Sequence, residues 1–274
     1  MQDRGPSAYI AEFIGTFFLV FFITAAFSLY VSPPPAFSDF GTIGLVYALV
    51  LFVLVSAFSV ASGAHFNPAV TVAMTALRQM KPADAGIYVI TQLAGGVAGA
   101  LVTKLLLDDE GGRTGVNYGA PAVNPARFGD AVILPGMVAE FLGTFLLVLV
   151  IVGVAVHSRS ARDTVHARSS DETANPRSFG ETGNPWSAKE TAALAIGATF
   201  GVAAMVIAPL TGASFNPARA FGPALVAGEF GGVGNFILVF VVAPILGAVA
   251  AAAAYFSLYV APGKKGVGGM EPVD

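Results

Sequence analysis

Two short motifs place an asparagine and a proline inside apolar stretches of this 274-residue chain. They are Asn67-Pro68-Ala69 in the first half and Asn216-Pro217-Ala218 in the second. Asparagine caps the free N–H groups of a helix and proline fits the first helical position, so each motif predicts a helix start. The two helices would cover Ala69–Leu77 and Ala218–Val226, about ten residues or about 15 Å each, roughly half of a bilayer core. If they met end to end, two positive helix ends and two side-chain amides would point at one spot in a pore.

Six long apolar segments must position these half-helices, and each is near or above the length that spans a bilayer. They run approximately over Ala8–Val31, Phe40–Ala61, Ala85–Leu107, Ala131–Val156, Glu190–Ala208 and Val233–Val260. One half-helix falls between the second and third segments, and the other between the fifth and sixth. We therefore expect an all-α membrane protein with six transmembrane helices and two half-helices.

The composition agrees with this class of protein. Apolar residues make up 55% of the chain and charged residues 11%, a balance typical of polytopic membrane proteins. The net charge of −3 gives no indication of a nucleic-acid partner, and the absence of cysteine excludes disulfides and thiolate metal sites. No nucleophile, metal cluster or acid–base pair can be assembled from the sequence, so we expect neither an enzyme nor a cofactor.

The two halves of the chain also resemble each other. Ala11–Phe17 (AEFIGTF) matches Ala139–Phe145 (AEFLGTF), and Gln92–Gly95 matches Pro244–Gly247 weakly. Each half contains three spans, and an odd number forces the second copy to be inverted in the membrane. We therefore expect two inverted repeats, residues 1–130 and 131–274, in one channel domain with its site at the repeat interface.

Lysine and arginine predict the orientation. If both termini are cytoplasmic, most basic residues lie inside, and they are Arg4, Arg78, Lys81, Arg159, Arg162, Arg168, Arg177, Lys189, Lys264 and Lys265. The outside keeps only Lys104, Arg113 and Arg127, apart from Arg219 in the second half-helix. The positive-inside rule therefore favours cytoplasmic termini.

These features resemble the aquaporin, or major intrinsic protein, family. The resemblance extends from Glu12 to about Tyr259 and rests on the two Asn-Pro-Ala motifs, the repeated Ala-Glu-Phe-x-Gly-Thr sequence and the two half-helices. It implies a homotetramer in the plasma membrane with a pore in each subunit. The implied partners are water, small neutral solutes and the lipid bilayer.

Asn67, Asn216 and Arg219 are the residues we expect to exclude protons and cations. A water molecule at the midplane would accept hydrogen bonds from both amides, its hydrogens would point away along the pore, and the proton wire would be broken. The alternative is that the asparagines only cap buried helices. The resemblance implies that Arg219 lies at the outer constriction. A structural salt bridge is the alternative, although the next acidic residue along the chain is Glu229.

Four further polar residues are expected to support the loops before the half-helices. Glu12 and Glu140 would accept hydrogen bonds from irregular backbone, which must be satisfied in a membrane, and a proton relay is the alternative. Gln92 would also support a loop. His65 resembles the family's vestibule histidine and either orients its loop or contacts permeant water.

The resemblance implies a selectivity filter of Tyr47, Ala204, Ala213 and Arg219. Narrow water-specific members carry histidine where this chain has Ala204, so the two alanines favour a wider constriction that passes glycerol, hydrogen peroxide, ammonia or urea as well as water. Two residues differ from those typical of glycerol facilitators. Ala220 stands where glycerol facilitators usually have aspartate, and Tyr47 stands where they tend to have tryptophan.

Two other stretches need an interpretation. A third Asn-Pro-Ala-Arg sequence, Asn124 to Arg127, lacks an apolar half-helix and is expected to form a capped turn in an outer loop. The polar stretch from His157 to Ala188 is expected to be a flexible cytoplasmic loop, and a gate controlled by pH or phosphorylation is conceivable there.

The favoured function is a passive channel for water and small uncharged solutes such as glycerol. One alternative is a glycerol or small-solute facilitator with low water flux. A coupled secondary transporter shares the inverted repeats, but beyond the two glutamates it would lack titratable groups at the midplane. A closed structural membrane protein is the third alternative, and the two asparagines and Arg219 argue against it.

Overall fold

The computed structural model describes residues 4–31, 38–111, 115–169 and 188–260, and these are almost entirely helical. Five long helices are α1 (Pro6–Tyr30), α2 (Phe40–Ser62), α4 (Pro82–Leu106), α7 (Ile133–Ser169) and α8 (Ala188–Thr211). The last long helix is continuous and consists of α10 (Val233–Ile237), a π-helical segment (Leu238–Val242), α11 (Ala243–Tyr255) and a second π-helical segment (Phe256–Val260). The short ones are α3 (Pro68–Ala76), α9 (Pro217–Ala227), α5 (Asp108–Gly111), α6 (Pro125–Phe128) and a 3₁₀ turn (Asn117–Gly119). Six of these helices are long and apolar enough to cross a membrane, which confirms the predicted fold class.

The largest difference from the sequence-based expectation lies at the end of α7. We expected a loop from His157, but α7 continues as a helix to Ser169. Adding residues to an existing helix avoids the cost of nucleation, so a polar segment can extend an apolar helix beyond the membrane. The rest of the stretch expected to be a loop, residues 170–187, lies outside the described residues.

The helices pack with the symmetry expected of two repeats. α1 packs on α4 as α7 packs on α11, while α2 packs on α8. Half-helix α9 packs on α4 and half-helix α3 packs on α11, so each is held by a long helix from the other half of the chain. Close approach needs glycine here, because a Cβ at Gly95 would collide with the Phe13 carbonyl and one at Gly247 with the Phe141 carbonyl.

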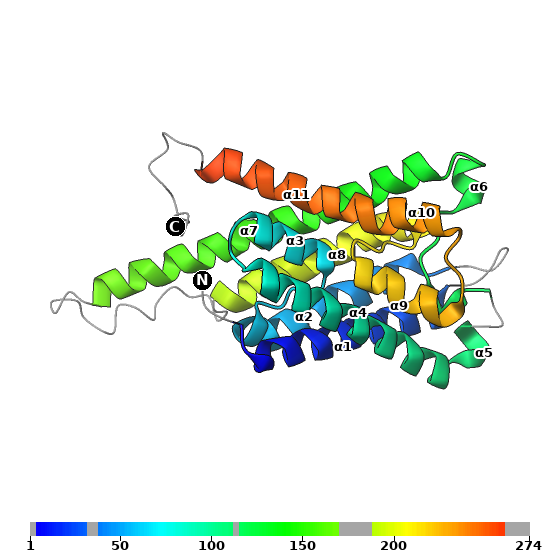
Figure 1. Cartoon of the computed structure of the whole chain (residues 1–274), viewed down its shortest axis with the longest axis horizontal. Helices are drawn as coiled ribbons and strands as arrows, with labels where there is room; N and C mark the ends of the chain where they lie inside the picture. Colours follow the sequence, from blue (N-terminus) through cyan, green and yellow to red (C-terminus); the bar gives the residue numbers. More distant parts are fainter. Residues whose placement is uncertain (1–3, 32–37, 112–114, 170–187, 261–274) are drawn as a thin grey trace.

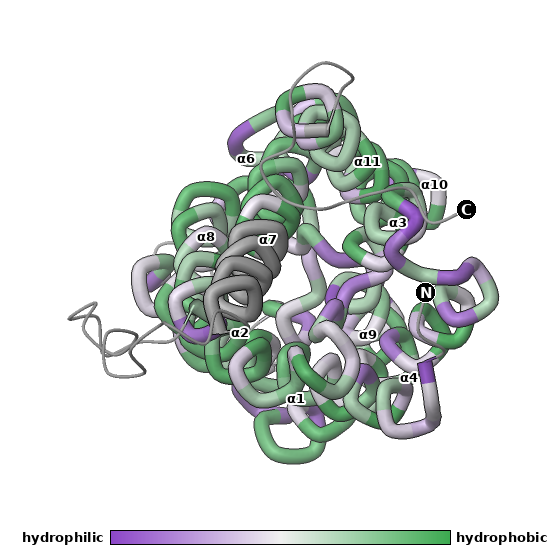
Figure 2. The backbone as a smooth tube through the Cα atoms, turned by 90° about the vertical axis from the view of Figure 1, so that its left-hand side faces the viewer, coloured by the Kyte–Doolittle hydropathy of each residue, from purple (hydrophilic) through white to green (hydrophobic). Residues whose placement is uncertain are grey.

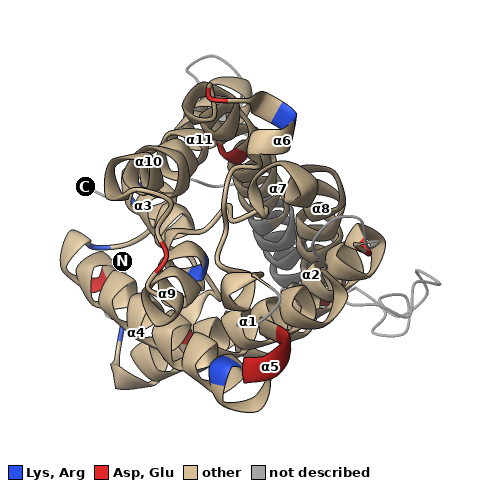
Figure 3. Cartoon of the chain, turned by 90° about the vertical axis from the view of Figure 1, so that its right-hand side faces the viewer, with Lys and Arg blue, Asp and Glu red and all other residues tan. Residues whose placement is uncertain are grey.

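The first turn of α1 and the end of the last helix lie at the same end of the molecule, on the left in Figure 1. We call this the α1 end. The acidic helix α5 and the short helix α6 lie at the opposite end, the α5 end, where Figure 3 shows their charges.

Apolar side chains face outward over most of the bundle. Val60, Leu105, Leu134 and Ile90 are 83%, 79%, 71% and 68% exposed, as expected for residues that face lipid or another subunit. Figure 2 shows hydrophilic stretches of chain in the middle of the ring of hydrophobic helices. Non-helical backbone is tolerated at membrane depth only where it is buried in protein or lines a cavity.

Candidate functional site

The loops that lead into α3 and α9 have unusual backbone. In the first loop φ is +88° at Gly63, +54° at Ala64 and +49° at Phe66. For alanine and phenylalanine this left-handed conformation costs roughly 1–2 kcal/mol per residue, so it persists only where the surroundings impose it. The bend turns the chain back into the protein and aims the first turn of α3 at the centre.

Glu12 from α1 holds the first loop in this shape. One carboxylate oxygen accepts hydrogen bonds from the Ser62 hydroxyl (2.6 Å) and the His65 N–H (2.9 Å). The other accepts from the Phe66 N–H (2.7 Å) and the Gln92 amide (2.7 Å). Glu12 is fully buried, so these donors replace the water that it loses.

Glu140 from α7 holds the second loop in the corresponding way. It accepts hydrogen bonds from the Thr211 hydroxyl (2.6 Å), the Ser214 N–H (2.9 Å) and the Phe215 N–H (2.6 Å). The structure therefore places both glutamates against the irregular backbone before the half-helices. Gln92 supports the first loop indirectly, through its bonds to Glu12 and to the Thr71 hydroxyl of α3.

Asn67 and Asn216 meet where the two half-helices begin. Each side-chain oxygen caps its own helix, at 2.9 Å from the Ala69 N–H and 2.9 Å from the Ala218 N–H. Each amide nitrogen donates to the opposite loop, Asn67 to the Phe215 carbonyl and Asn216 to the Phe66 carbonyl, both at 2.8 Å. A primary amide has two N–H groups, so each asparagine keeps one for a further acceptor.

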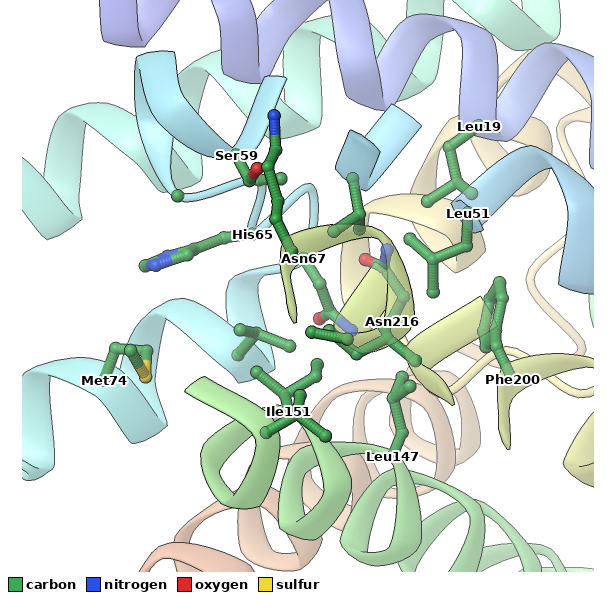
Figure 4. Close-up of a pocket in the computed structure, with 18 of the residues that line it drawn as sticks. Leu19, Leu51, Ser59, His65, Asn67, Met74, Leu147, Ile151, Phe200 and Asn216 are labelled. Atoms are coloured by element: carbon green, nitrogen blue, oxygen red, sulfur yellow. The ribbon is translucent and has the colours of Figure 1, made fainter. Parts of the chain in front are cut away.

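A cavity of about 440 Å³ leads from the α1 end to these asparagines. Figure 4 shows both asparagine side chains facing the space between Leu19 and Leu51 on one side and Leu147 and Ile151 on the other. The walls of the cavity are mostly apolar, with a few polar groups among them. The remaining cavity-lining residues at the α1 end include Arg4, Lys189 and His65.

His65 both lines the cavity and supports α3. Its Nδ1 lies 3.1 Å from the Thr71 hydroxyl, and its ring packs edge-on against Tyr88 at 5.3 Å. Gln92 donates to the same Thr71 hydroxyl at 3.0 Å. The two roles that the sequence left open for His65 are therefore compatible with one position.

Arg219 is completely buried in the first turns of α9, on the α5 side of the asparagines. Its Nε donates to the Tyr47 hydroxyl at 3.2 Å, and Nη2 donates to the Gly212 carbonyl at 3.1 Å. The guanidinium carbon lies 5.2 Å from the centre of the Phe27 ring. Along the chain the next acidic residue is Glu229, but in the fold Glu140 from α7 lies close enough to interact with Arg219 electrostatically.

The four candidate filter residues do not all make the same contacts. Tyr47 and Arg219 are hydrogen-bonded, and the Ala213 carbonyl accepts a hydrogen bond from the Tyr47 hydroxyl at 2.9 Å. Ala204 of α8 is buried in the same apolar cluster as Tyr47 and Ala213. All four side chains are inaccessible in the structure.

Sequence reasoning missed several residues that shape the site. Phe66 and Phe215 supply the carbonyls that bind the two asparagines, and Phe27 and Phe200 place rings beside Arg219 and Tyr47. The repeated Phe-Asn-Pro sequence was a signal for the first pair. Nothing in the local sequence marks Phe27, because it lies far from Arg219 along the chain.

The third Asn-Pro-Ala sequence forms the capped turn that we predicted. The Asn124 side-chain oxygen accepts from the Ala126 N–H at 3.0 Å, and the helix that it caps, α6, has four residues. It lies at the α5 end of the molecule (Figure 1), where the Asn124 side-chain amide donates to the Pro209 carbonyl near the end of α8 at 3.2 Å.

Membrane-spanning helices that surround two half-helices, joined head to head at the end of a cavity, define a pore-forming membrane protein. The family model described as "Major intrinsic protein" matches residues 4–169 and 177–255, and the chain belongs to this family.

Relatives from plants, archaea and bacteria agree with this assignment. Aquaporin NIP1-1 of Oryza sativa subsp. japonica is 34% identical over 90% of this chain and 72% of its own length. Aquaporin AqpM of Methanothermobacter thermautotrophicus is 33% identical over 90% of this chain and 94% of its own. Glycerol uptake facilitator protein-like 6 of Lactiplantibacillus plantarum is 33% identical over 89% and 94%.

A solved structure, the aquaglyceroporin of Plasmodium falciparum, has the same fold. It is 20% identical, with a TM-score of 0.66 over 91% of this chain and 94% of its own. The family is one of channels and transporters rather than enzymes, and this chain is a multi-pass membrane protein that forms a passive channel for water and small solutes.

Proposed function

We propose that the channel conducts water and small uncharged solutes, with glycerol among them, and excludes protons and cations at Asn67, Asn216 and Arg219. The observation that carries this proposal is the cross-pairing of the asparagines with opposite loops. It fixes both amides at the end of the cavity and leaves each with one N–H for a passing molecule.

The barrier to protons follows from these amides and the helix ends. α3 and α9 both begin at this point, and each helix N-terminus carries about half a positive charge. A water molecule here would turn its oxygen to the amides and its hydrogens away along the pore. Proton transfer along a hydrogen-bonded chain of water molecules would be interrupted at this molecule.

Arg219 would form the second barrier. It is fully buried, and a cation that passed about 8 Å from its charge would be repelled by about 2 kcal/mol at an effective dielectric constant of 20. That energy corresponds to roughly a thirtyfold lower rate of cation passage.

The setting of the channel belongs to the same proposal. The protein would be a homotetramer in the plasma membrane, composed of repeats 1–130 and 131–274, with both termini and the α1 end in the cytoplasm. The basic residues of the proposed cytoplasmic segments support this orientation. Mass measurement of the detergent-solubilised complex would test the tetramer.

The experiment uses purified protein in proteoliposomes. Stopped-flow light scattering measures water and glycerol permeability, and an internal pH dye measures proton leak. We expect Asn216→Asp and Arg219→Val each to raise proton or cation leak by about tenfold or more while water flow largely persists.

The third Asn-Pro-Ala-Arg sequence supplies the control. Asn124→Asp and Arg127→Val make the same two changes at the α5 end, and the leak should stay at the wild-type level. Unchanged leak in Asn216→Asp and Arg219→Val would show that the barrier lies elsewhere. Failure of the wild type to conduct water would contradict the proposed function itself.

A further inference from the structure

Positive charge alone lines the mouth of the cavity at the α1 end. Among the described residues of this lining, the charged side chains are Arg4, just before α1, and Lys189, in the first turn of α8. No aspartate or glutamate of the described chain belongs to the lining. At the inner end of the cavity α3 and α9 begin, and each helix N-terminus adds about half a positive charge. The cavity therefore attracts anions from the α1 end.

Arg4 is held in place by uncharged groups. Its Nη1 donates to the Ser62 carbonyl at 2.9 Å, and its guanidinium carbon lies 6.0 Å from the centre of the Tyr88 ring. The Tyr88 hydroxyl donates to the same carbonyl at 2.8 Å. Nε and Nη2 of Arg4 make no hydrogen bond or ion pair to the described residues. The guanidinium is thus fixed at the mouth of the cavity with two nitrogens left for a ligand.

Polar groups flank the gap that Gly63 leaves at the end of α2. A Cβ at Gly63 would lie 3.6 Å from Arg4 Nη2 and 3.5 Å from His65 Nε2, so both nitrogens border this gap. Ser59 also lines the cavity (Figure 4), and its buried hydroxyl has no hydrogen-bond partner in the described part of the chain. One wall of the cavity therefore carries a guanidinium and a hydroxyl that can each donate to an acceptor.

Lys189 supplies the second cation, from the other half of the chain. Its side chain is partly buried and makes no hydrogen bond or ion pair within the described residues. The neighbouring Glu190 is exposed and does not belong to the lining of the cavity. An anion in the cavity is therefore attracted by two cations that have no carboxylate of their own there.

We propose that the α1 end of the cavity binds a phosphate ion, with Arg4 and Lys189 as its charged partners, and that the bound ion obstructs the path of water. A planar guanidinium presents N–H groups that match the oxygens of an oxyanion, and Arg4 keeps Nε and Nη2 for this purpose. The cavity of about 440 Å³ is within the range of roughly 300–1,000 Å³ that is typical of small-molecule sites. Such a site goes beyond the proposed function, which concerns what the channel conducts.

A dissolved phosphate ion and the headgroup of a lipid would share this chemistry. Helices from both halves of the chain surround the cavity, through Leu19 of α1, Leu51 of α2, Val70 of α3, Leu147 of α7 and Ile196 of α8. A headgroup would have to enter this enclosure while its acyl chains stay in the bilayer. The geometry therefore favours the dissolved ion.

Water permeability of proteoliposomes tests the site. The vesicles contain only phosphatidylcholine, and sodium phosphate replaces sodium chloride on both sides of the membrane at equal ionic strength and osmolality. We expect phosphate in the millimolar range to lower the water permeability of the wild type. Lys189→Gln and Arg4→Gln should each raise the half-inhibitory phosphate concentration by about tenfold, because each removes one of the two charges. Equal permeability of the wild type in phosphate and in chloride would overturn the proposal.

Lys81→Gln and Arg78→Gln are the matched controls. Lys81 precedes α4 and Arg78 lies between α3 and α4, both near the α1 end, and neither lines the cavity. Each control removes the same charge as Lys189→Gln or Arg4→Gln, so its half-inhibitory concentration should equal that of the wild type. An equal rise in the controls would indicate an effect of surface potential and would overturn the assignment. If Arg4→Gln fails to fold because it loses the bond to Ser62, the comparison of Lys189→Gln with Lys81→Gln still decides.

Binding can also be measured without transport. Phosphorus NMR of the detergent-solubilised protein should show a broadened inorganic phosphate signal for the wild type and Lys81→Gln, and less broadening for Lys189→Gln. Equal broadening in all three would overturn the site. A wild type that binds phosphate but conducts no water in chloride would contradict the proposed function alone. Inhibition that needs phosphatidylglycerol in the vesicles and no added phosphate would assign the site to a lipid headgroup and overturn the choice of a dissolved ion.

Discussion

The loops before α3 and α9 follow nearly the same path through the protein. φ is +54° at Ala64 and +47° at Ala213, and it is +49° at Phe66 and +53° at Phe215. A buried glutamate accepts the loop N–H groups in both halves, and an asparagine caps the half-helix in both. The backbone scaffold is therefore shared by the two repeats.

The side chains on that scaffold differ. The residue three positions after the asparagine is Val70 in the first half and Arg219 in the second. Gln92 donates to Glu12 in the first half, and the weak sequence match puts Pro244 in its place in the second. The first loop keeps free carbonyls beside the cavity, whereas Tyr47 and Arg219 use those of the second loop.

The residues that shape the two loops are thus alike in both halves, while the residues proposed to select solutes differ. The bend requires an acceptor for strained backbone N–H groups, and both halves supply one. In the proposed mechanism one charge along the path is enough to repel cations, and burying a charge is expensive, which agrees with its presence in the second half alone. Substitutions that act on the scaffold should then have similar effects in both halves, while those that act on selection should not.

The largest expected effect comes from Glu140→Gln compared with Glu12→Gln. Each change replaces one acceptor oxygen by an amide NH2 group, which then faces a backbone N–H that has lost its acceptor. Glu140→Gln also leaves the buried Arg219 without a nearby negative charge. We expect a loss in the free energy of unfolding of about 1–3 kcal/mol for Glu12→Gln and a loss about 1–2 kcal/mol larger for Glu140→Gln.

Denaturant titration of the purified protein in detergent measures both losses. Equal losses would mean that the Glu140 charge contributes nothing to holding Arg219 in place. The two glutamates would then stabilise the protein only through their hydrogen bonds to the loops.

The second prediction concerns the glycines that face the loops. A Cβ at Gly15 would overlap the Phe66 ring, and one at Gly143 would overlap the Phe215 ring. Gly15→Ala and Gly143→Ala should each cost about 1–3 kcal/mol through overpacking, with closely similar values.

Gly86→Ala serves as the control for these two variants, because a Cβ at this position in α4 meets no other atom. It should be neutral or stabilising, by up to about 1 kcal/mol, as expected for alanine in a helix. Clearly unequal losses for Gly15→Ala and Gly143→Ala in the same titration would break the symmetry of the scaffold.

The smallest effect is expected at the third Asn-Pro-Ala sequence. Asn124→Ala removes a helix cap at the α5 end and the bond from the Asn124 amide to the Pro209 carbonyl. It should cost about 1–2 kcal/mol, with no change in water permeability or proton leak. Asn67→Ala also loses a cap and an amide–carbonyl bond, but that bond joins the two loops at the end of the cavity, so this variant should alter transport. Altered transport in Asn124→Ala would mean that the capped turn is coupled to the pore.

The sequence by itself determined the number of spans, their approximate bounds and the two half-helices. The physical reason is that a bilayer demands long apolar helices, and that asparagine and proline mark helix starts wherever they occur. The error at the end of α7 arose because polar composition does not show where an existing helix stops.

Only the tertiary structure decided which residues from the two halves of the chain contact each other. The bond from Asn67 to Phe215 and the bond from Arg219 to Tyr47 join residues that are 148 and 172 positions apart, and no local pattern encodes such a pairing. The same limit applies to the filter. Ala204 and Ala213 predict a wide opening, and its width also depends on the rings that the fold places in the same buried cluster, those of Tyr47 and Phe200.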